Sequence, residues 1–136
     1  MNVGFIGYSP PTSFDEFGAR ALIRYALQHE MQVHTDITVV SGATALGVPK
    51  LVYEEARVFH LPTIGVMCKE GEGYEVWPVD KLFTVGEHWG DESAFFLSML
   101  DKLYRIGGGV QSLAETAQAK QLGIPVIEYN INVFSK

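Results

Sequence analysis

The sequence predicts an α/β fold, a three-layer Rossmann-like sandwich around a mostly parallel sheet of about six strands. Two observations support this prediction. Short β-prone runs alternate with stretches of helical periodicity along the chain, and several of the runs end in a glycine-containing turn that leads into a helix. Such alternation is typical of parallel strands joined by right-handed crossovers, with helices on both faces of the sheet. We expect residues 1–136 to form a single domain of this kind.

The first half of the chain predicts three strands and two helices. The strands are mostly apolar runs at residues 3–8, 37–41 and 62–67. Ser13 is expected to cap a helix over residues 14–30, with a buried stripe of Phe14, Phe17, Ala21, Leu22 and Tyr25. A second helix is expected after Gly47, with a buried stripe of Val48, Leu51, Val52, Ala56 and Phe59. Glu55 borders that stripe and is expected to reach solvent.

The second half predicts strands at residues 82–86, 101–106 and 124–129. A helix over residues 92–101 is expected to have Asp91 as its N-cap, and a last helix begins at Val110 with Leu113, Ala114 and Ala117 on one face. Residues 68–78 predict a flexible loop, either a surface crossover or a lid that brings Tyr74 and Trp77 onto a ligand. Arg105 lies within a central strand, which favours a structural salt bridge.

Four glycine-containing turns follow residues 6, 41, 85 and 106, at the carboxyl ends of predicted strands. Ligands bind at this edge in parallel sheets of this class. The most informative turn is Gly107-Gly108-Gly109, because the helix after it begins with backbone N–H groups that have no internal partner and with the positive end of the helix dipole. An anion is the natural partner, and Ser112 can add a hydroxyl donor. The alternative is a tight turn that binds nothing.

Composition excludes several classes of function. The net charge of −6 argues against a broad electrostatic grip on nucleic acid. The single cysteine, Cys68, forms no internal disulfide, and the histidines show no metal-ligand spacing, so we expect no metal site. No run approaches the ~18 apolar residues of a membrane span. We therefore expect a cytoplasmic protein that does not contact a membrane.

Two of the turns resemble motifs of the SLOG superfamily, which includes the LOG cytokinin-activating proteins, the DNA-processing SMF proteins and the molybdenum-cofactor carrier proteins. Residues 40–48 (VSGATALGV) resemble its first glycine motif. Residues 106–115 (IGGGVQSLAE) resemble its second, written P-G-G-x-G-T-x-x-E in the LOG proteins. Gly107 and Gly108 match the glycine pair, Ser112 stands for the threonine and Glu115 matches the glutamate, whereas the positions of Ile106 and Gln111 depart from the motif. The resemblance implies a nucleotide-like ligand and a homo-oligomer.

Three functions remain open. The first is binding of a nucleotide or a nucleotide-derived phosphorylated small molecule. The second is a LOG-like nucleotide hydrolase, a phosphoribohydrolase, with Glu115 and His88 as tentative acid–base groups; LOG enzymes also use an arginine, and residues 87–92 (EHWGDE) offer none. The third is a partner-binding protein with a vestigial pocket. No cofactor other than the nucleotide-like ligand is expected. The expected ligand-binding residues are Gly7, Tyr8, Ser9, Ser41, Gly42, Thr44, Gly47, Gly86, Glu87, Gly107, Gly108, Gly109, Gln111 and Ser112.

Overall fold

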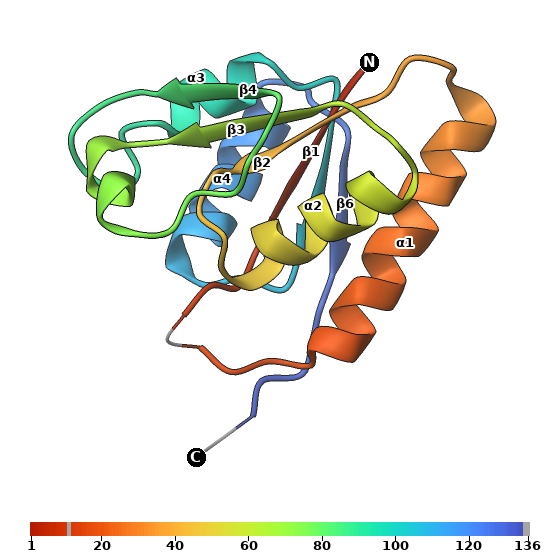
Figure 1. The fold of residues 1–136 in the computed structure, drawn as a ribbon, viewed down its shortest axis with the longest axis horizontal. Helices are drawn as coiled ribbons and strands as arrows, with labels where there is room; N and C mark the ends of the chain where they lie inside the picture. The colour runs from red at the N-terminus through yellow and green to blue at the C-terminus, as the bar shows by residue number, and fades with distance from the viewer. Residues whose placement is uncertain (11, 135–136) are drawn as a thin grey trace.

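The computed structural model describes residues 1–10 and 12–134, and within them six parallel strands form one sheet in the order β4-β3-β2-β1-β5-β6 (Figure 1). The strands are β1 Asn2–Gly7, β2 Thr38–Gly42, β3 Thr63–Met67, β4 Lys81–Thr84, β5 Lys102–Ile106 and β6 Val126–Tyr129. The helices are α1 Glu16–Val33, α2 Gly47–Val58, α3 Ser93–Ser98 and α4 Val110–Gln121, with a 3₁₀ turn η1 at Lys69–Gly73. The predicted α/β Rossmann-like fold is confirmed.

Helices cover both faces of the sheet. Helices α1 and α2 pack on one face over Phe5 and Val39, and α3 and α4 lie on the other face over Ile6 and Val40 (Figure 1). Successive residues of a strand point to opposite faces, so strands covered on both sides are apolar throughout. The chain runs outward from β1 to β4 and then returns to place β5 on the other side of β1. Strand order therefore reverses between β1 and β5, where ligands bind in open sheets of this class.

The prediction for the first helix was wrong in its boundaries and in its buried face. Helix α1 begins at Glu16, because the carboxylate of Asp15, and not Ser13, accepts a hydrogen bond from the Gly18 N–H. Phe17 is 88% exposed and Tyr25 is exposed as well. The buried residues of α1 are Ala19, Ile23, Ala26, Leu27 and Glu30. The helix has two apolar stripes, and the one that is buried packs mainly against α2.

Helix α4 is also turned relative to the prediction. Val110 is 88% exposed and Leu113 is 53% exposed, although both belong to the apolar stripe. The buried residues are Ser112, Glu115, Thr116 and Ala119. The polar groups on this face are satisfied by hydrogen bonds, for example from the Thr116 hydroxyl to the Ser112 carbonyl, so their burial carries little penalty.

Two smaller predictions were also wrong, and of the two alternatives for residues 68–78 the structure shows the surface crossover between β3 and β4. Asp91 does not cap α3; its carboxylate accepts hydrogen bonds from the N–H groups of Glu87 and His88 in the preceding turn. Glu55 is 1% exposed, because arginines of α1 reach it. The segment after β3 is ordered by η1 and by backbone pairing with residues 43–45, and Trp77 stacks on Tyr53. Among the described residues, no helix is long and apolar enough to cross a membrane.

Candidate functional site

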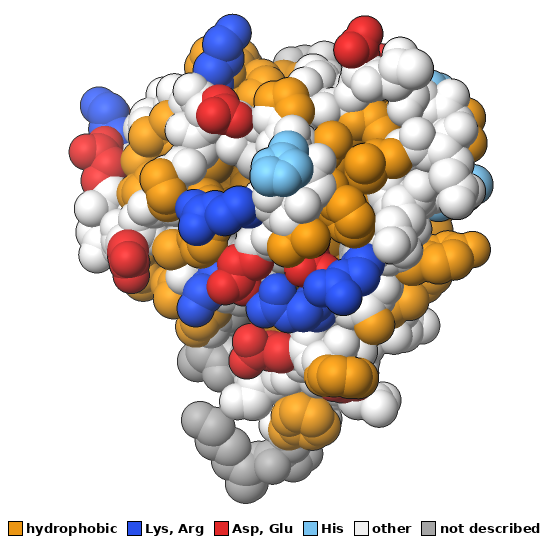
Figure 2. Space-filling model, turned by 45° about the vertical axis from the view of Figure 1, so that its right-hand side comes forward, with side chains coloured by type: hydrophobic (Ala, Val, Ile, Leu, Met, Phe, Trp, Pro, Cys, Tyr) orange, Lys and Arg blue, Asp and Glu red, His pale blue; other side chains and the backbone are white. Residues whose placement is uncertain are grey.

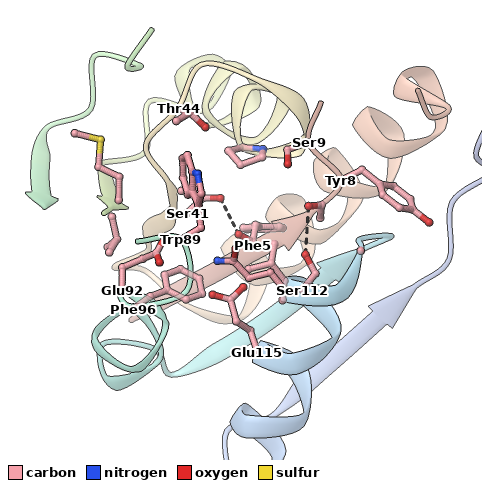
Figure 3. A pocket seen from close by; sticks show the side chains of 18 of the residues that line it. Phe5, Tyr8, Ser9, Ser41, Thr44, Trp89, Glu92, Phe96, Ser112 and Glu115 are labelled. Atoms are coloured by element: carbon pink, nitrogen blue, oxygen red, sulfur yellow. Dashed lines mark hydrogen bonds between the residues drawn. The ribbon is translucent and has the colours of Figure 1, made fainter. Parts of the chain in front are cut away.

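A cavity of about 350 Å³ lies at the carboxyl ends of the central strands (Figure 3). Residues from both glycine turns line it, Ser41, Gly42 and Thr44 from the first and Gly109 and Gln111 from the second. The full lining consists of Phe5, Ile6, Gly7, Tyr8, Ser9, Pro10, Thr12, Ser41, Gly42, Ala43, Thr44, Pro49, Val66, Met67, Trp89, Glu92, Phe96, Gly109, Val110, Gln111, Ser112 and Glu115. Two segments far apart in the sequence therefore share one cavity.

Six residues expected at the site lie outside this lining: Gly47, Gly86, Glu87, His88, Gly107 and Gly108. Gly47 has a φ of 61° and brings the start of α2 against the Tyr8 carbonyl, which a Cβ would overlap. Gly86 adopts a φ of 79° against Asp91. These glycines shape the turns that surround the cavity and do not contact its interior.

The three glycines of the second glycine turn, residues 107–109, have different roles. Gly107 and Gly108 have φ values of 66° and 118°, and a Cβ would overlap the Tyr8 ring at Gly107 and the Ser112 side chain at Gly108. They let the turn pack tightly. Gly109 differs, because its φ is −95° and no described atom lies within 4 Å of a Cβ placed there. Gly109 is therefore the glycine of this turn that opens onto the cavity.

The N-terminus of α4 supplies the hydrogen-bond donors of the site. The N-cap residue, Gly109, has no side chain that could accept from these N–H groups. The Gly109 carbonyl accepts a hydrogen bond from the Leu113 N–H at 3.0 Å. The N–H groups of residues 110–112 belong to the first turn of the helix, and no helical carbonyl lies one turn before them to accept their hydrogen bonds. The N-terminus of α2 offers fewer donors, because Val48 N–H donates to the Tyr8 carbonyl at 2.8 Å and Pro49 has no N–H. An anion is therefore best placed at α4.

Two of the three serines of the lining, Ser41 and Ser112, hydrogen-bond to β1. Ser41 Oγ donates to the Phe5 carbonyl oxygen at 2.7 Å, and Ser112 Oγ donates to the Gly7 carbonyl oxygen at 3.3 Å (Figure 3). With its hydrogen engaged in this way, Ser112 presents oxygen lone pairs to the cavity. The predicted hydroxyl donation to an anion would require the bond to Gly7 to break.

Two buried carboxylates lie deeper in the cavity. Glu115 is 7% exposed and accepts a hydrogen bond from Ser93 Oγ at 2.7 Å. Burial raises the pKa of Glu115 above the usual range of a glutamic acid, and hydrogen bonds from Ser93 and Gln111 partly oppose this rise. Glu92 is 6% exposed and accepts from the Gly90 N–H at 2.7 Å. Among the residues of the lining that the structure describes, none is a lysine, arginine or histidine. The cavity therefore offers main-chain donors at α4 and carboxylate acceptors beside them.

The residues of the segment after β4 that line the cavity are not the ones that the sequence predicted. The His88 side chain is 79% exposed and contacts Glu70, and Glu87 pairs with Lys69 at 3.0 Å on the surface. The residues that reach the cavity are Trp89, Glu92 and Phe96. The sequence places these three residues after a strand whose carboxyl end lies at the edge of the sheet where ligands bind. It does not show which side chains of that segment point into the cavity.

The comparisons with solved structures show that other proteins share this Rossmann-like α/β fold. One similar structure is the molybdenum cofactor binding protein from the phototrophic bacterium Rippkaea orientalis, with 19% identity and a TM-score of 0.78 over 96% of this chain and 77% of that chain. Another is the molybdenum cofactor carrier protein from Chlamydomonas reinhardtii, with 22% identity and a TM-score of 0.72 over 93% and 74%. No family model and no curated protein matches the chain.

Proposed function

We propose that the protein binds a phosphorylated small molecule, a nucleotide or a nucleotide-derived compound such as a pterin phosphate, with the phosphate at the N-terminus of α4. One observation carries the proposal: the uncapped first turn of α4 opens through Gly109 onto a cavity of about 350 Å³. Helix N-termini bind phosphates through free N–H groups and the helix dipole, without needing a basic side chain. The two solved neighbours, which bind or carry molybdenum cofactor, support a binding role.

The test uses two glycine substitutions that the backbone tolerates. Gly109 and Gly73 both have open space where a Cβ would be, and neither has a positive φ, but only Gly109 lines the cavity. Ribose 5-phosphate, GMP, AMP and neopterin monophosphate are titrated by calorimetry and by thermal shift. A ligand at 100 times its Kd stabilises the folded state by about 2.7 kcal/mol.

We expect at least one of these phosphates to bind the unsubstituted protein. Gly109→Val should weaken this binding by tenfold or more, whereas Gly73→Val should bind like the unsubstituted protein. Absence of binding by every compound of the panel would overturn the proposal. So would a folded Gly109→Val variant with unchanged affinity, because the phosphate would then lie elsewhere.

A second function, hydrolysis of a nucleotide N-glycosidic bond, is favoured by the burial and the raised pKa of Glu115. A buried carboxyl with a raised pKa, aimed into a ligand cavity, is suited to acid–base chemistry. Release of free base from AMP or GMP, abolished in Glu115→Gln, would establish this activity. Binding without turnover would support the binding function and not the hydrolase.

A homo-oligomer is the third part of the proposal. The outer face of α4 exposes Val110 and Leu113 together with the smaller Ala114 and Ala117. An exposed apolar stripe on a regular helix is a surface that a second copy can cover. The same stripe would serve the alternative in which the protein binds another partner.

A further inference from the structure

One side of the cavity is built from the turn after β4. In the close-up view, Trp89, Glu92 and Phe96 lie on one side of the pocket, and Tyr8, Ser9 and Ser112 lie on the other (Figure 3). If the phosphate lies at α4, as proposed above, the rest of the ligand extends toward the first group. The chemistry of that group then determines what kind of head group fits.

Trp89 is held in place by contacts outside the cavity. Glu70 Oε1 accepts a hydrogen bond from the Trp89 backbone N–H at 3.1 Å and lies 3.0 Å from His88 Nδ1. The ring of Tyr74 meets the indole edge-on, with 5.8 Å between centroids. The Trp89 residue nevertheless remains 44% exposed. The indole is thus positioned in advance at the cavity and has surface left for a ligand, which lowers the ordering cost of binding.

Glu92 presents an acceptor to the same space. Its Oε1 is fixed by the Gly90 N–H at 2.7 Å. Within residues 1–10 and 12–134, no hydrogen bond reaches Glu92 Oε2, and no fully buried side-chain oxygen is left without a partner, so this atom is accessible and belongs to a residue that lines the cavity. An ionised carboxylate that is largely buried needs donors. The described residues of the cavity lining include no basic side chain, so a ligand that carries N–H donors can take the place of water at this carboxylate.

We infer that this end of the cavity takes a planar heterocycle that stacks on Trp89 and donates two adjacent N–H groups to the Glu92 carboxylate. The inference rests on the proposed function. The 2-amino-4-oxopyrimidine edge of guanine and of pterins has this pattern and matches the two oxygens of one carboxylate. Adenine places an acceptor nitrogen beside its amino group and would set that lone pair against a carboxylate oxygen. Glu70 acts as a positioning residue, since it touches Trp89 and not the cavity.

The experiment measures GMP, neopterin monophosphate, AMP and ribose 5-phosphate in a Trp77→Phe background, so that fluorescence reports Trp89 alone. We expect GMP or neopterin monophosphate, or both, to quench this fluorescence and to bind at least fivefold more tightly than AMP. Base–aromatic stacking and a bidentate contact are each worth about 1–3 kcal/mol, or roughly 5- to 150-fold. The preferred compound of the two tells whether the head group is a guanine or a pterin.

Four variants test the roles of Trp89, Glu92 and Glu70, with affinities measured by calorimetry where Trp89 is replaced. Trp89→Ala should weaken the preferred ring compound by fivefold or more, change ribose 5-phosphate less than twofold, and be largely rescued in Trp89→Phe. Glu92→Gln should bring the preference over AMP close to one. Glu70→Gln should weaken the ring compounds and shift the emission of unliganded Trp89, which a residue with no positioning role would not do.

The inference and the proposed function fail in different ways. If GMP or neopterin monophosphate binds but Trp89→Ala binds it equally well, or if AMP binds as tightly, this inference is overturned and the phosphate site stands. If none of the four compounds binds the unsubstituted protein, both are overturned. Melting temperatures of all variants show whether any loss of binding comes from unfolding.

Discussion

The guanidinium of Arg105 donates a hydrogen bond from Nη1 to the carbonyl oxygen of Gly107 at 2.8 Å, which links the end of strand β5 to the glycine turn that follows it. Its Nε donates to Glu128 at 3.0 Å and its Nη2 to Asn130 at 3.1 Å. The structural salt bridge expected for Arg105 is thus confirmed. The planar fork of arginine lets one side chain hold β5, β6 and the turn together.

Arg105→Met should lower the free energy of unfolding by about 2–3 kcal/mol, because it leaves the buried Gly107 carbonyl without its charged donor and removes the links to Glu128 and Asn130. Lys120→Met provides the control, since Lys120 pairs with the same Glu128 but is 57% exposed. Urea denaturation measures both. A loss in Arg105→Met no greater than that in Lys120→Met would show that the contact with Gly107 carries no stability.

Glu55 should matter more to stability than its neighbour Glu54. The Glu55 carboxylate is 2% exposed and accepts hydrogen bonds from Arg24 at 2.5 and 3.2 Å, whereas Glu54 is 32% exposed and pairs with Arg20. Basic and acidic side chains alternate across this α1 and α2 face (Figure 2). Glu55→Gln should cost about 1–3 kcal/mol and Glu54→Gln less than about 1 kcal/mol in urea denaturation. Equal effects would contradict the importance of burial here.

Gly47→Ala and Gly123→Ala separate backbone strain from steric overlap. Both glycines have a positive φ, 61° and 77°, but a Cβ overlaps the Tyr8 carbonyl only at Gly47. Gly123→Ala should cost about 1–2 kcal/mol for the left-handed conformation. Gly47→Ala should cost clearly more, because Tyr8 and α2 must also move apart. Thermal unfolding would refute this explanation if the two variants lost the same stability.

Glu115 should make the protein less stable as pH rises. Its pKa is raised in the folded state by burial, so the folded protein binds a proton more tightly than the unfolded chain does. Its contribution is therefore most favourable below the unfolded pKa and is lost as pH rises through the folded pKa. Glu115→Gln should remove this term, and its stability relative to the unsubstituted protein should increase from pH 4 to pH 7. Urea denaturation at the two pH values checks the sign; a stability of Glu115→Gln that falls relative to the unsubstituted protein toward pH 7 would contradict the assignment.

Leu113→Lys should dissociate the proposed oligomer by placing a charge on the apolar face of α4. Phe17→Lys is the control, because Phe17 is also highly exposed but belongs to α1. Light scattering after size-exclusion chromatography gives the mass of each. A monomeric unsubstituted protein, or an oligomer that survives Leu113→Lys, would show that this face is not the interface.

The alternation of strands and helices, and the glycine turns between them, were readable from the sequence because both depend on neighbouring residues. Apolar runs identified β1, β2, β3 and β5, and the second glycine turn was correctly placed before α4. The pairing of Arg105 was predictable as well, since a charge in a central strand requires a partner.

The tertiary structure alone decided which faces are buried and which side chains reach the cavity. Helices α1 and α4 both present another face to the sheet than their apolar periodicity predicted, and His88 points outward where Trp89 and Glu92 line the pocket. Periodicity records which residues share a face of a helix. The rotation of that helix about its axis is fixed by packing and hydrogen bonds with distant segments, and buried polar groups such as Ser112 and Glu115 become acceptable only when those segments supply partners.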